Sequence, residues 1–257
     1  MHTFCDLIFF AERMPEGPSI VILKDAVKSF KGKRILSATG TTKKLDLAEL
    51  VNQRITSFKS WGKHFLICLP KFTIRIHLLM FGTYRVNERK DAPPRLALRF
   101  SNNEEINFYS CAITRIDTPL NEVYDWSSDI MNRKFDVRKA NSKLRKHSSM
   151  LVCDAILDQN IFAGAGNIFK NEVLFRIRTH PLSTVGALPP RKRNELVKEV
   201  VTYGKDFLRW KKAFVLRKHW EAHTKRTCPR DGNKLVKAYL GRTGRRSFFC
   251  EACQVKY

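Results

Sequence analysis

The sequence contains no apolar run that approaches the roughly 18 to 20 residues needed to span a bilayer, which excludes an integral membrane protein. It also lacks a cationic start ahead of the apolar patch near its beginning. A signal peptide is therefore not expected, and the protein is predicted to be intracellular and cytoplasmic. Internal repeats and low-complexity tracts are absent as well. Acidic residues are scarce, with 24 Asp and Glu against 48 Lys and Arg in 257 residues.

Apolar and aromatic residues, in contrast, occur along the whole chain. The sequence is 43% hydrophobic and contains 18 Phe and 4 Trp, so a disordered basic tail is excluded. A formal net charge of +24 on a folded protein costs self-repulsion and indicates a polyanionic partner. Nucleic acid is the first expectation and an anionic membrane surface the second. Residues 133–257 hold 29 basic and 10 acidic side chains, which places the expected contact surface mainly in this half.

The first half predicts a β-rich domain with helices at its margins. Short strand-like segments separated by turn residues occur at 64–69, 72–79, 82–86, 95–100 and 105–110. This pattern favours a sheet or a sandwich. Apolar residues at helical intervals predict a helix over 19–32, which would end at Gly32.

The second half predicts helices that end in a small hairpin. Periodicity of 3.6 residues indicates helices over 147–159, 167–177 and 190–210. The polar stretch 125–146 suits a linker. After about His219 the chain is expected to close with a Cys-bearing hairpin, so the fold class is α+β.

Cysteine spacing predicts a metal site near the end of the chain. Cys5, Cys68, Cys111 and Cys153 are isolated and are expected to be buried thiols. By contrast, three cysteines lie within 26 residues, and in a reducing compartment they suggest a metal site: Cys228, Cys250 and Cys253. Either His223 or Asp231 must supply the fourth ligand. We expect His223, because thiolate-rich structural zinc sites take imidazole more readily than carboxylate.

The segment MPEGP at 14–18 offers a nucleophile if translation starts at Met14. Removal of this Met would leave Pro15 as a secondary amine whose pKa of about 8 keeps a fraction unprotonated at neutral pH. Such an amine attacks an aldehyde-like carbon to give an iminium directly, and Glu16 lies one residue away for proton transfer. The alternative is that PEGP is an ordinary turn.

A second motif, AGAGNIFKNE at 163–172, predicts a phosphate-binding turn. Its small residues allow a tight turn into a helix that begins near Asn167, so backbone N–H groups and the Asn amide can receive a phosphate. An ordinary Gly-rich helix corner is the alternative. Near the end of the chain, GRTGRRSFF forms a basic, aromatic hairpin suited to entering a nucleic-acid groove.

In this order, the three motifs resemble those of the Fpg/Nei (formamidopyrimidine-DNA glycosylase/endonuclease VIII) family of base-excision repair enzymes, over residues 14 to 257. The resemblance implies a catalytic N-terminal β-sandwich over 15–130 with flanking helices. It further implies a helix-two-turn-helix domain over 140–222 and a zinc-finger hairpin over 223–257. Residues 1–14 would be an extension.

Site residues follow from the same resemblance. Pro15 corresponds to the nucleophile that attacks C1′ of the damaged nucleotide, and Glu16 to the acid that protonates the sugar as its ring opens. Lys63 corresponds to a strand lysine that contacts phosphate and assists catalysis. Asn167 corresponds to a backbone-binding Asn. Arg245 corresponds to the finger arginine that holds the flanking phosphates, with Arg246 as its neighbouring substitute.

The resemblance also assigns a void-filling loop. Extruding a base forfeits a few kcal/mol of stacking, which bulky side chains must replace. Within IHLLMFGTYRV, the family's loop corresponds to Leu79, Met80 and Phe81. The alternative is that these three belong to a core strand.

Departures from the family pattern refine the expected substrate. Ser19 stands where the family often has Glu, so proton transfer near the sugar can differ. The Arg-Phe-Gly signature and the Gly/Thr-rich loop of the Fpg branch are missing. These absences indicate the Nei branch, which prefers oxidised pyrimidines such as thymine glycol. The incomplete Cys set leaves open a finger without zinc.

As written, Pro15 is an internal amide with no nucleophilic lone pair. We expect either that the functional start is Met14 or that residues 1–14 are removed, with an upstream start assigned in error as the preferred explanation. A genuine extension that silences catalysis is the rival.

The sequence thus predicts a bifunctional DNA glycosylase/β,δ-lyase. It would act as a monomer on double-stranded DNA that contains oxidised bases or abasic sites, with one structural Zn²⁺ and no diffusible cofactor. The competing prediction is a non-enzymatic DNA- or RNA-binding module that uses the same helical and finger surfaces and binds with steep salt dependence.

Overall fold

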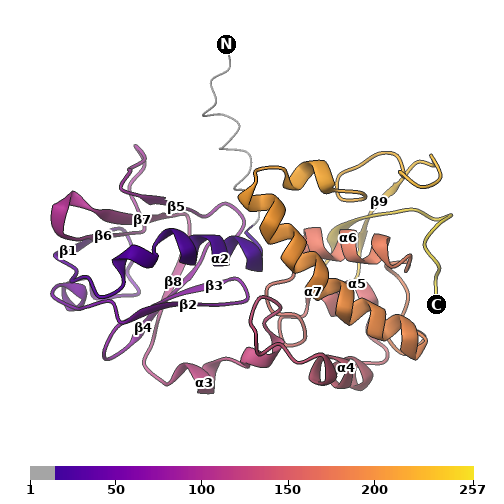
Figure 1. The fold of residues 1–257 in the computed structure, drawn as a ribbon, viewed down its shortest axis with the longest axis horizontal. Coiled ribbons are helices and arrows are strands. Elements are labelled where there is room, and N and C mark those ends of the chain that lie inside the picture. The colour runs from indigo at the N-terminus through magenta and orange to yellow at the C-terminus, as the bar shows by residue number, and fades with distance from the viewer. Residues whose placement is uncertain (1–14) are drawn as a thin grey trace, which may run out of the picture. The chain divides into compact units, whose positions relative to one another are not determined.

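The computed structural model describes residues 15–257, which form two compact units (Figure 1). The first, here called the N-terminal domain, ends at Tyr124, and the C-terminal domain is Asp125–Tyr257. The expected extension 1–14 lies outside the described residues. The predicted domain boundaries at 130, 140 and 222 stay predictions.

The N-terminal domain contains two antiparallel four-stranded sheets. One sheet has the order β1-β6-β7-β5 and the other β2-β3-β4-β8. The strand bounds are β1 Ser37–Thr39, β2 Ser57–Trp61, β3 His64–Cys68, β4 Thr73–His77, β5 Thr83–Val86, β6 Leu96–Arg99, β7 Glu105–Tyr109 and β8 Ala112–Ile116. Each of the five predicted strand segments contains a strand, one to three residues shorter than predicted.

Alternating side chains place one apolar core between the sheets. In β3 and β4, Phe65 and Ile74 point inward and are fully buried, and Phe65 packs against Phe108 of the other sheet with ring centroids 5.9 Å apart. The period of two along a strand puts every second residue on this inner face. The core explains the predicted sandwich, which is confirmed as two packed sheets.

Helix α2, Gly17–Ala26, packs against β2 and β3. It is shorter than the predicted helix over 19–32. The chain leaves the α-helix at Val27 and forms a 3₁₀ turn at Lys28–Phe30. This turn brings Phe30 into the core, where its ring lies 4.8 Å from that of Phe100. A continued α-helix would direct the Phe30 side chain elsewhere.

The C-terminal domain begins with helices. After the short helix α3, Leu120–Val123, which closes the N-terminal domain, the bounds are α4 Val137–Lys146, α5 Val152–Leu157, α6 Asn167–Arg176, α7 Pro190–Lys212 and the 3₁₀ helix η5 Leu216–His219. Helices α5, α6 and α7 confirm the predicted helical segments, α5 being shorter. In the described residues, no helix is both long and apolar enough to cross a membrane.

The predicted linker over 125–146 is wrong for its second half, which forms α4. Asp136 caps this helix, since its Oδ1 accepts hydrogen bonds from the N–H groups of Arg138 (2.8 Å) and Lys139 (3.0 Å). Only Ala140 and Leu144 are buried on it, so its sequence is dominated by exposed basic residues. A polar composition therefore concealed a helix that needs just one narrow apolar stripe.

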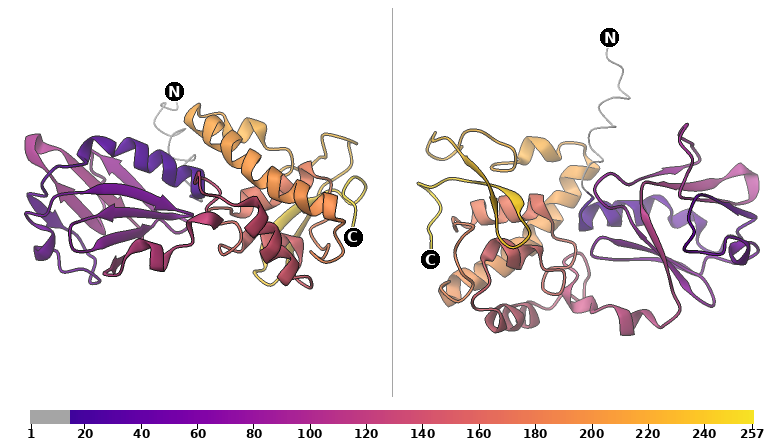
Figure 2. Two further views of the ribbon diagram at one scale, coloured as in Figure 1. Left: turned by 60° about the horizontal axis from the view of Figure 1, so that its bottom comes forward. Right: turned by 180° about the vertical axis from the view of Figure 1, so that it is seen from behind.

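The chain ends in the hairpin β9 Val236–Leu240 and β10 Arg245–Phe249, the finger hairpin, which packs on α6 (Figure 2). In the register, Arg245 pairs with Leu240 and Phe249 with Val236. This arrangement confirms the predicted closing hairpin. Cys68, Cys111 and Cys153 are free and buried, as expected, whereas Cys5 lies outside the described residues.

Candidate nucleic-acid interface and metal site

Pro15 and Glu16 lie at the first turn of α2. Both residues are buried, and the Glu16 side chain is 2% exposed. The Glu16 carbonyl accepts a hydrogen bond from Ser19 N–H (2.8 Å), which opens the helix. Glu16 is therefore the residue that directly precedes the helix. The Ser19 hydroxyl, also buried, has no hydrogen-bond partner among the described residues.

Lys63 lies in the tight turn between β2 and β3. Gly62, at φ 53°, takes the left-handed conformation that this turn requires. The first turn of α2 and the β2–β3 turn lie at the same end of the N-terminal domain (Figures 1 and 2). Lys63 is half-buried, and its charge contributes, after burial, to a lowered pKa of His77 in β4.

The segment Leu79–Phe81 projects from the same end, directly after β4. The side chains are 49%, 43% and 66% exposed, so the core-strand alternative is wrong. Leu79 takes φ 54°, and Gly82 N–H returns to the Leu78 carbonyl at 2.6 Å. A Cβ at Gly82 would lie 1.9 Å from that carbonyl oxygen, so only glycine closes this loop. Three bulky apolar side chains are therefore held in solvent by a strained turn.

Histidines line the adjoining outer face of the sheet. His64 and His77 are direct partners in the β3–β4 ladder, with ring centroids 5.2 Å apart, and His64 Nδ1 lies 3.1 Å from the Tyr124 hydroxyl. Burial, followed by the charges of His77 and Arg75, lowers the pKa of His64 to about 4. His64 is therefore neutral at neutral pH.

In the C-terminal domain, the predicted Gly-rich turn leads into α6 at Asn167. Gln159 holds this turn, because its Oε1 accepts from Gly164 N–H (2.9 Å) and its Nε2 donates to the Ala165 carbonyl (3.1 Å). Gly164 needs its φ of 101°. Asn167 Nδ2 donates to the Arg246 carbonyl at 3.1 Å, so the turn and the finger hairpin meet here.

Helices α5 and α6 hold the tip of the finger hairpin. Lys170, 1% exposed, donates from Nζ to the carbonyls of Arg245 (3.3 Å) and Arg246 (3.0 Å) and to Ser247 Oγ (2.9 Å). Asp154 of α5 accepts from Arg242 N–H at 2.9 Å in the turn before β10. The Arg245 side chain is exposed, and hydrogen bonds from Lys170 and Asp154 fix the backbone on both sides of it.

Glu172 of α6 fixes the segment that precedes the finger. Its carboxylate is fully buried and accepts hydrogen bonds from three consecutive backbone N–H groups, those of Glu221 (2.9 Å), Ala222 (3.0 Å) and His223 (2.7 Å). Burial raises the pKa of Glu172, which the three donors oppose. A single buried carboxylate thus satisfies the backbone N–H groups of three consecutive residues.

Four potential metal ligands gather at the base of the finger: Cys228, Asp231, Cys250 and Cys253. Their ligand atoms all lie within 4.8 Å of one another. A tetrahedron with Zn–S bonds of about 2.3 Å has S···S edges of about 3.8 Å, and Cys228 Sγ lies 3.8 Å from Cys253 Sγ. Three thiols and one carboxylate are a donor set that fits a closed, structural metal site.

His223 is not part of this cluster, which corrects the expectation that it is the fourth ligand. Asp231 takes that place, with Oδ2 3.1 Å from Cys250 Sγ. The His223 ring is instead buried against α6, where Nδ1 accepts a hydrogen bond from Asn171 Nδ2 (2.9 Å) and the ring meets Trp220 edge-on. Sequence spacing alone did not distinguish His223 from Asp231, because both lie close to Cys228 in the sequence.

Two family models match the chain. The formamidopyrimidine-DNA glycosylase N-terminal domain matches residues 14–111, and the helix-two-turn-helix domain of the same glycosylase matches residues 127–213. The chain belongs to the Fpg/Nei family. The family membership that the motifs indicated is thereby confirmed.

Relatives within the Fpg/Nei family are similar over much of this chain. Endonuclease 8-like 2 of Bos taurus is 34% identical over 197 residues, covering 70% of this chain and 58% of the relative. An endonuclease 8-like protein of Acanthamoeba polyphaga mimivirus is 26% identical, over 94% of this chain and 100% of its own length. The chain therefore spans little more than half of the cattle relative.

Solved structures share the Fpg/Nei fold. A viral DNA glycosylase superposes with a TM-score of 0.81 at 24% identity, covering 93% of this chain and all of that one. The Lactococcus lactis formamidopyrimidine DNA glycosylase, bound non-covalently to DNA that contains an abasic site, superposes with a TM-score of 0.83 at 22% identity, covering 94% and 100%.

Sequence reasoning missed the polar residues of α6 that organise the finger. Lys170 and Glu172 belong to the motif 163–172, yet the 3.6-residue pattern gave no sign that both are buried. The available signal was their position on a helix whose apolar residues surround them, where a charged side chain must find partners.

Replacing Glu172 is expected to destabilise the C-terminal domain. In Glu172→Gln, the amide NH₂ faces backbone donors and loses the charge that three N–H groups stabilise, so the free energy of unfolding falls by about 2 to 4 kcal/mol. Urea denaturation followed by Trp fluorescence measures this loss. Glu195→Gln, at a half-exposed pair with Lys192, is the matched control and should change stability by less than about 1 kcal/mol. Equal effects of the two substitutions would contradict the proposed role.

Acid is expected to destabilise the protein through His223. Burial, followed by the charges of Lys170 and Arg246, lowers its pKa from 6.5 to about 4 in the folded chain. Below pH 6.5 the unfolded chain binds a proton that the folded chain does not, so stability falls as the pH drops from about 6.5 to about 4. Between pH 7 and pH 5 the difference amounts to about 2 kcal/mol. His223→Gln should flatten this dependence in urea titrations, and an unchanged slope would refute it.

Proposed function

We propose that the chain is a base-excision repair glycosylase that removes oxidised bases and then cleaves the strand as a lyase. The observation that carries this proposal is that several candidate site residues lie at one end of the N-terminal domain. There the first turn of α2, with Pro15 and Glu16, lies at the same end as the turn that bears Lys63 and the exposed loop Leu79–Phe81. A nucleophile, a proton donor, a cation and a void-filling loop are the parts that the reaction needs.

The reaction requires Pro15 to be the amino-terminal residue of the active chain. Its free nitrogen attacks C1′ of the extruded nucleotide, the glycosidic bond breaks, and the base leaves with the bonding electrons and a proton. Glu16 protonates the sugar oxygen as the ring opens, so that an iminium links protein and DNA. Elimination of the 3′ and then the 5′ phosphate leaves a one-nucleotide gap with phosphate ends, and water releases the protein.

The C-terminal domain supplies the grip on the phosphodiester backbone. Arg245 is exposed at a rigid part of the finger hairpin, and Asn167 opens α6 beside it. The N–H groups at the start of a helix and a guanidinium are both suited to phosphate oxygens. We propose that these residues and Lys63 hold the lesion strand of intracellular DNA, and that the protein acts as a monomer.

The cluster of Cys228, Asp231, Cys250 and Cys253 would hold a Zn²⁺ ion. When bound, the ion crosslinks the loop before β9 to the chain after β10 and takes no part in the chemistry. The cluster lies at the base of the finger, whereas Arg245 lies at its tip. Its contribution is therefore to the stability of the hairpin.

Strand cleavage tests the proposal. A chain that begins at Pro15 should nick a duplex with a single thymine glycol, leave the undamaged duplex intact, and act more slowly on 8-oxoguanine, because the Fpg-branch signature is missing. Saturable binding without nicking would favour the competing function, a silent nucleic-acid-binding protein.

Phe81 is expected to matter most for paired substrates. Phe81→Ala removes the most exposed of the three loop side chains, so single-turnover excision from a duplex should slow by roughly tenfold, since the vacated stack is left unfilled. The free energy of unfolding should change by less than about 0.5 kcal/mol. On a single-stranded lesion the variant should match the parent chain, and an equal loss on both substrates would argue against insertion into the stack.

A further inference from the structure

The finger hairpin has a second face, opposite to the one that bears Arg245. Because side chains alternate along a strand, Arg246 and Phe248 point away from Arg245. Their cross-strand partners are Tyr239 and Lys237, which share this face. Arg246, Lys237 and Tyr239 are exposed, and Tyr239 is 69% exposed. The hairpin therefore presents a basic and aromatic surface that the proposed glycosylase does not use.

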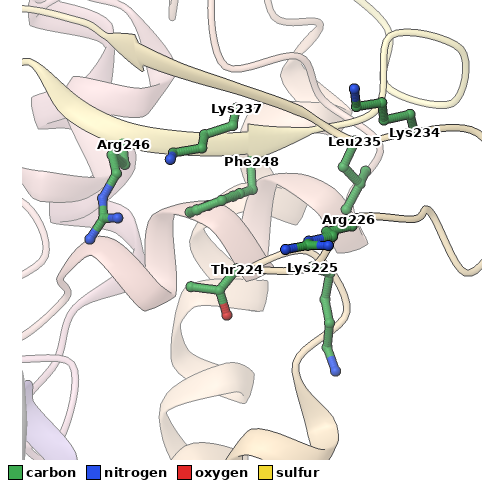
Figure 3. A pocket seen from close by; sticks show the side chains of 8 residues that line it. All are labelled: Thr224, Lys225, Arg226, Lys234, Leu235, Lys237, Arg246 and Phe248. Atoms are coloured by element: carbon green, nitrogen blue, oxygen red, sulfur yellow. The ribbon is translucent and has the colours of Figure 1, made fainter.

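A groove of about 480 Å³ lies between this face and the loop 224–226 (Figure 3). Arg246, Lys237 and Phe248 extend from the hairpin, and Thr224 and Arg226 lie on the loop that forms the other wall (Figure 3). Five of the eight lining residues are cationic and none is acidic. The cationic ones are Lys225, Arg226, Lys234, Lys237 and Arg246.

These five cations have no acidic partner in the part of the chain that the structure describes. Elsewhere in the same domain basic residues are paired, as Arg176 is with Glu199 and Glu221. Five unpaired like charges around one groove repel one another, and a bound polyanion removes this cost.

Helix α6 fixes both walls of the groove. Glu172 binds three backbone N–H groups just before the loop 224–226, and Lys170 binds the carbonyls of Arg245 and Arg246. Between them, Asn171 Oδ1 accepts from Phe248 N–H at 3.1 Å. The groove is therefore preformed, and binding costs little ordering of the backbone.

We propose that this groove binds single-stranded DNA. Its cations would follow the phosphodiester backbone while an unpaired base stacks on Tyr239, which lies directly across the hairpin from Arg246. A basic groove next to an exposed aromatic ring is the arrangement that recognises single strands, because only an unpaired base offers its face to a side chain. The bases of a duplex are stacked on one another and leave the Tyr239 ring uncovered. This inference does not depend on the lyase chemistry.

Fluorescence anisotropy of a labelled oligothymidine, with a duplex of the same length beside it, tests the proposal in the full chain. Lys234→Gln combined with Lys237→Gln should weaken oligothymidine binding by roughly tenfold and reduce the salt slope by about 1 to 2. The matched control, Lys198→Gln combined with Lys205→Gln on the exposed side of α7, changes the net charge equally and should leave both values near those of the parent chain. Tyr239→Ala should lose roughly tenfold and Tyr239→Phe should not.

Equal losses in the groove variant and the control would overturn the proposal. It would also be overturned if Tyr239→Ala bound oligothymidine as the parent does, because the groove would then contact only phosphates, as a duplex provides. The probe contains no lesion. Its binding is therefore measured whether or not the chain cleaves DNA, and failure of the proposed glycosylase would be seen separately.

Discussion

Borohydride should trap a covalent adduct between a thymine-glycol duplex and the chain that begins at Pro15, whereas the chain that retains residues 1–14 should give none. In the longer chain the Pro15 nitrogen is an amide and has no lone pair to offer. Pro15→Gly keeps a free amine but loses direct iminium formation and the fixed ring, so its adduct should fall by at least about 10²-fold. Denaturing electrophoresis of the labelled strand measures the adduct.

Binding must be saturated for this comparison to be decisive. Anisotropy of the same duplex, read before borohydride is added, establishes that all three chains occupy the DNA to the same extent. If the chain with residues 1–14 intact forms as much adduct as the chain that begins at Pro15, another amine is the nucleophile and the role of Pro15 is refuted.

The second large effect concerns the metal. The full chain purified from zinc-containing medium should hold a single equivalent of zinc, and Cys250→Ser should lose it together with several kcal/mol of finger stability. Asp231→Asn replaces a carboxylate by a weakly coordinating amide and should reduce zinc affinity by at least about tenfold. Release of zinc to a chromogenic chelator, with total metal measured by mass spectrometry, provides both values.

His223→Gln is the control for the ligand assignment. The His223 ring is held by Asn171 and lies outside the cluster, so this variant should keep its zinc. If His223→Gln releases zinc and Asp231→Asn does not, the finger must rearrange on metal binding, and the assignment of Asp231 is wrong.

Local patterns were sufficient to predict most of the elements. Strand segments such as 72–79 alternate so regularly that only one register buries Ile74 and Ile76. Helix α4 was missed, because two buried residues and a capping Asp136 are enough to hold a helix whose composition resembles that of a linker. The end of α2 was misplaced because Phe30 enters the core, a tertiary contact that no local pattern contains.

The site was predictable where a motif fixes its own geometry. A glycine shapes each of these two segments: Gly82 directly follows the loop Leu79–Phe81, and Gly164 lies in the turn before Asn167. The fourth position of the metal cluster was not predictable, because the choice between Asp231 and His223 depends on α6, which attracts the imidazole through Asn171. That contact joins residues 52 positions apart, and sequence spacing holds no information about it.

The finger hairpin is fastened twice, at its tip by Asp154 and Lys170 and at its base by the thiol and carboxylate cluster. The two attachments are chemically unrelated, since one consists of hydrogen bonds to backbone and the other of redox-sensitive sulfur. Oxidative stress, the condition that creates the proposed lesions, would thus oxidise the cysteines at the base of the hairpin and leave the hydrogen bonds at its tip in place. A chain whose cysteines have been oxidised should still present Arg245 to a phosphate. Its finger hairpin should be less stable, but the position of Arg245 should not change.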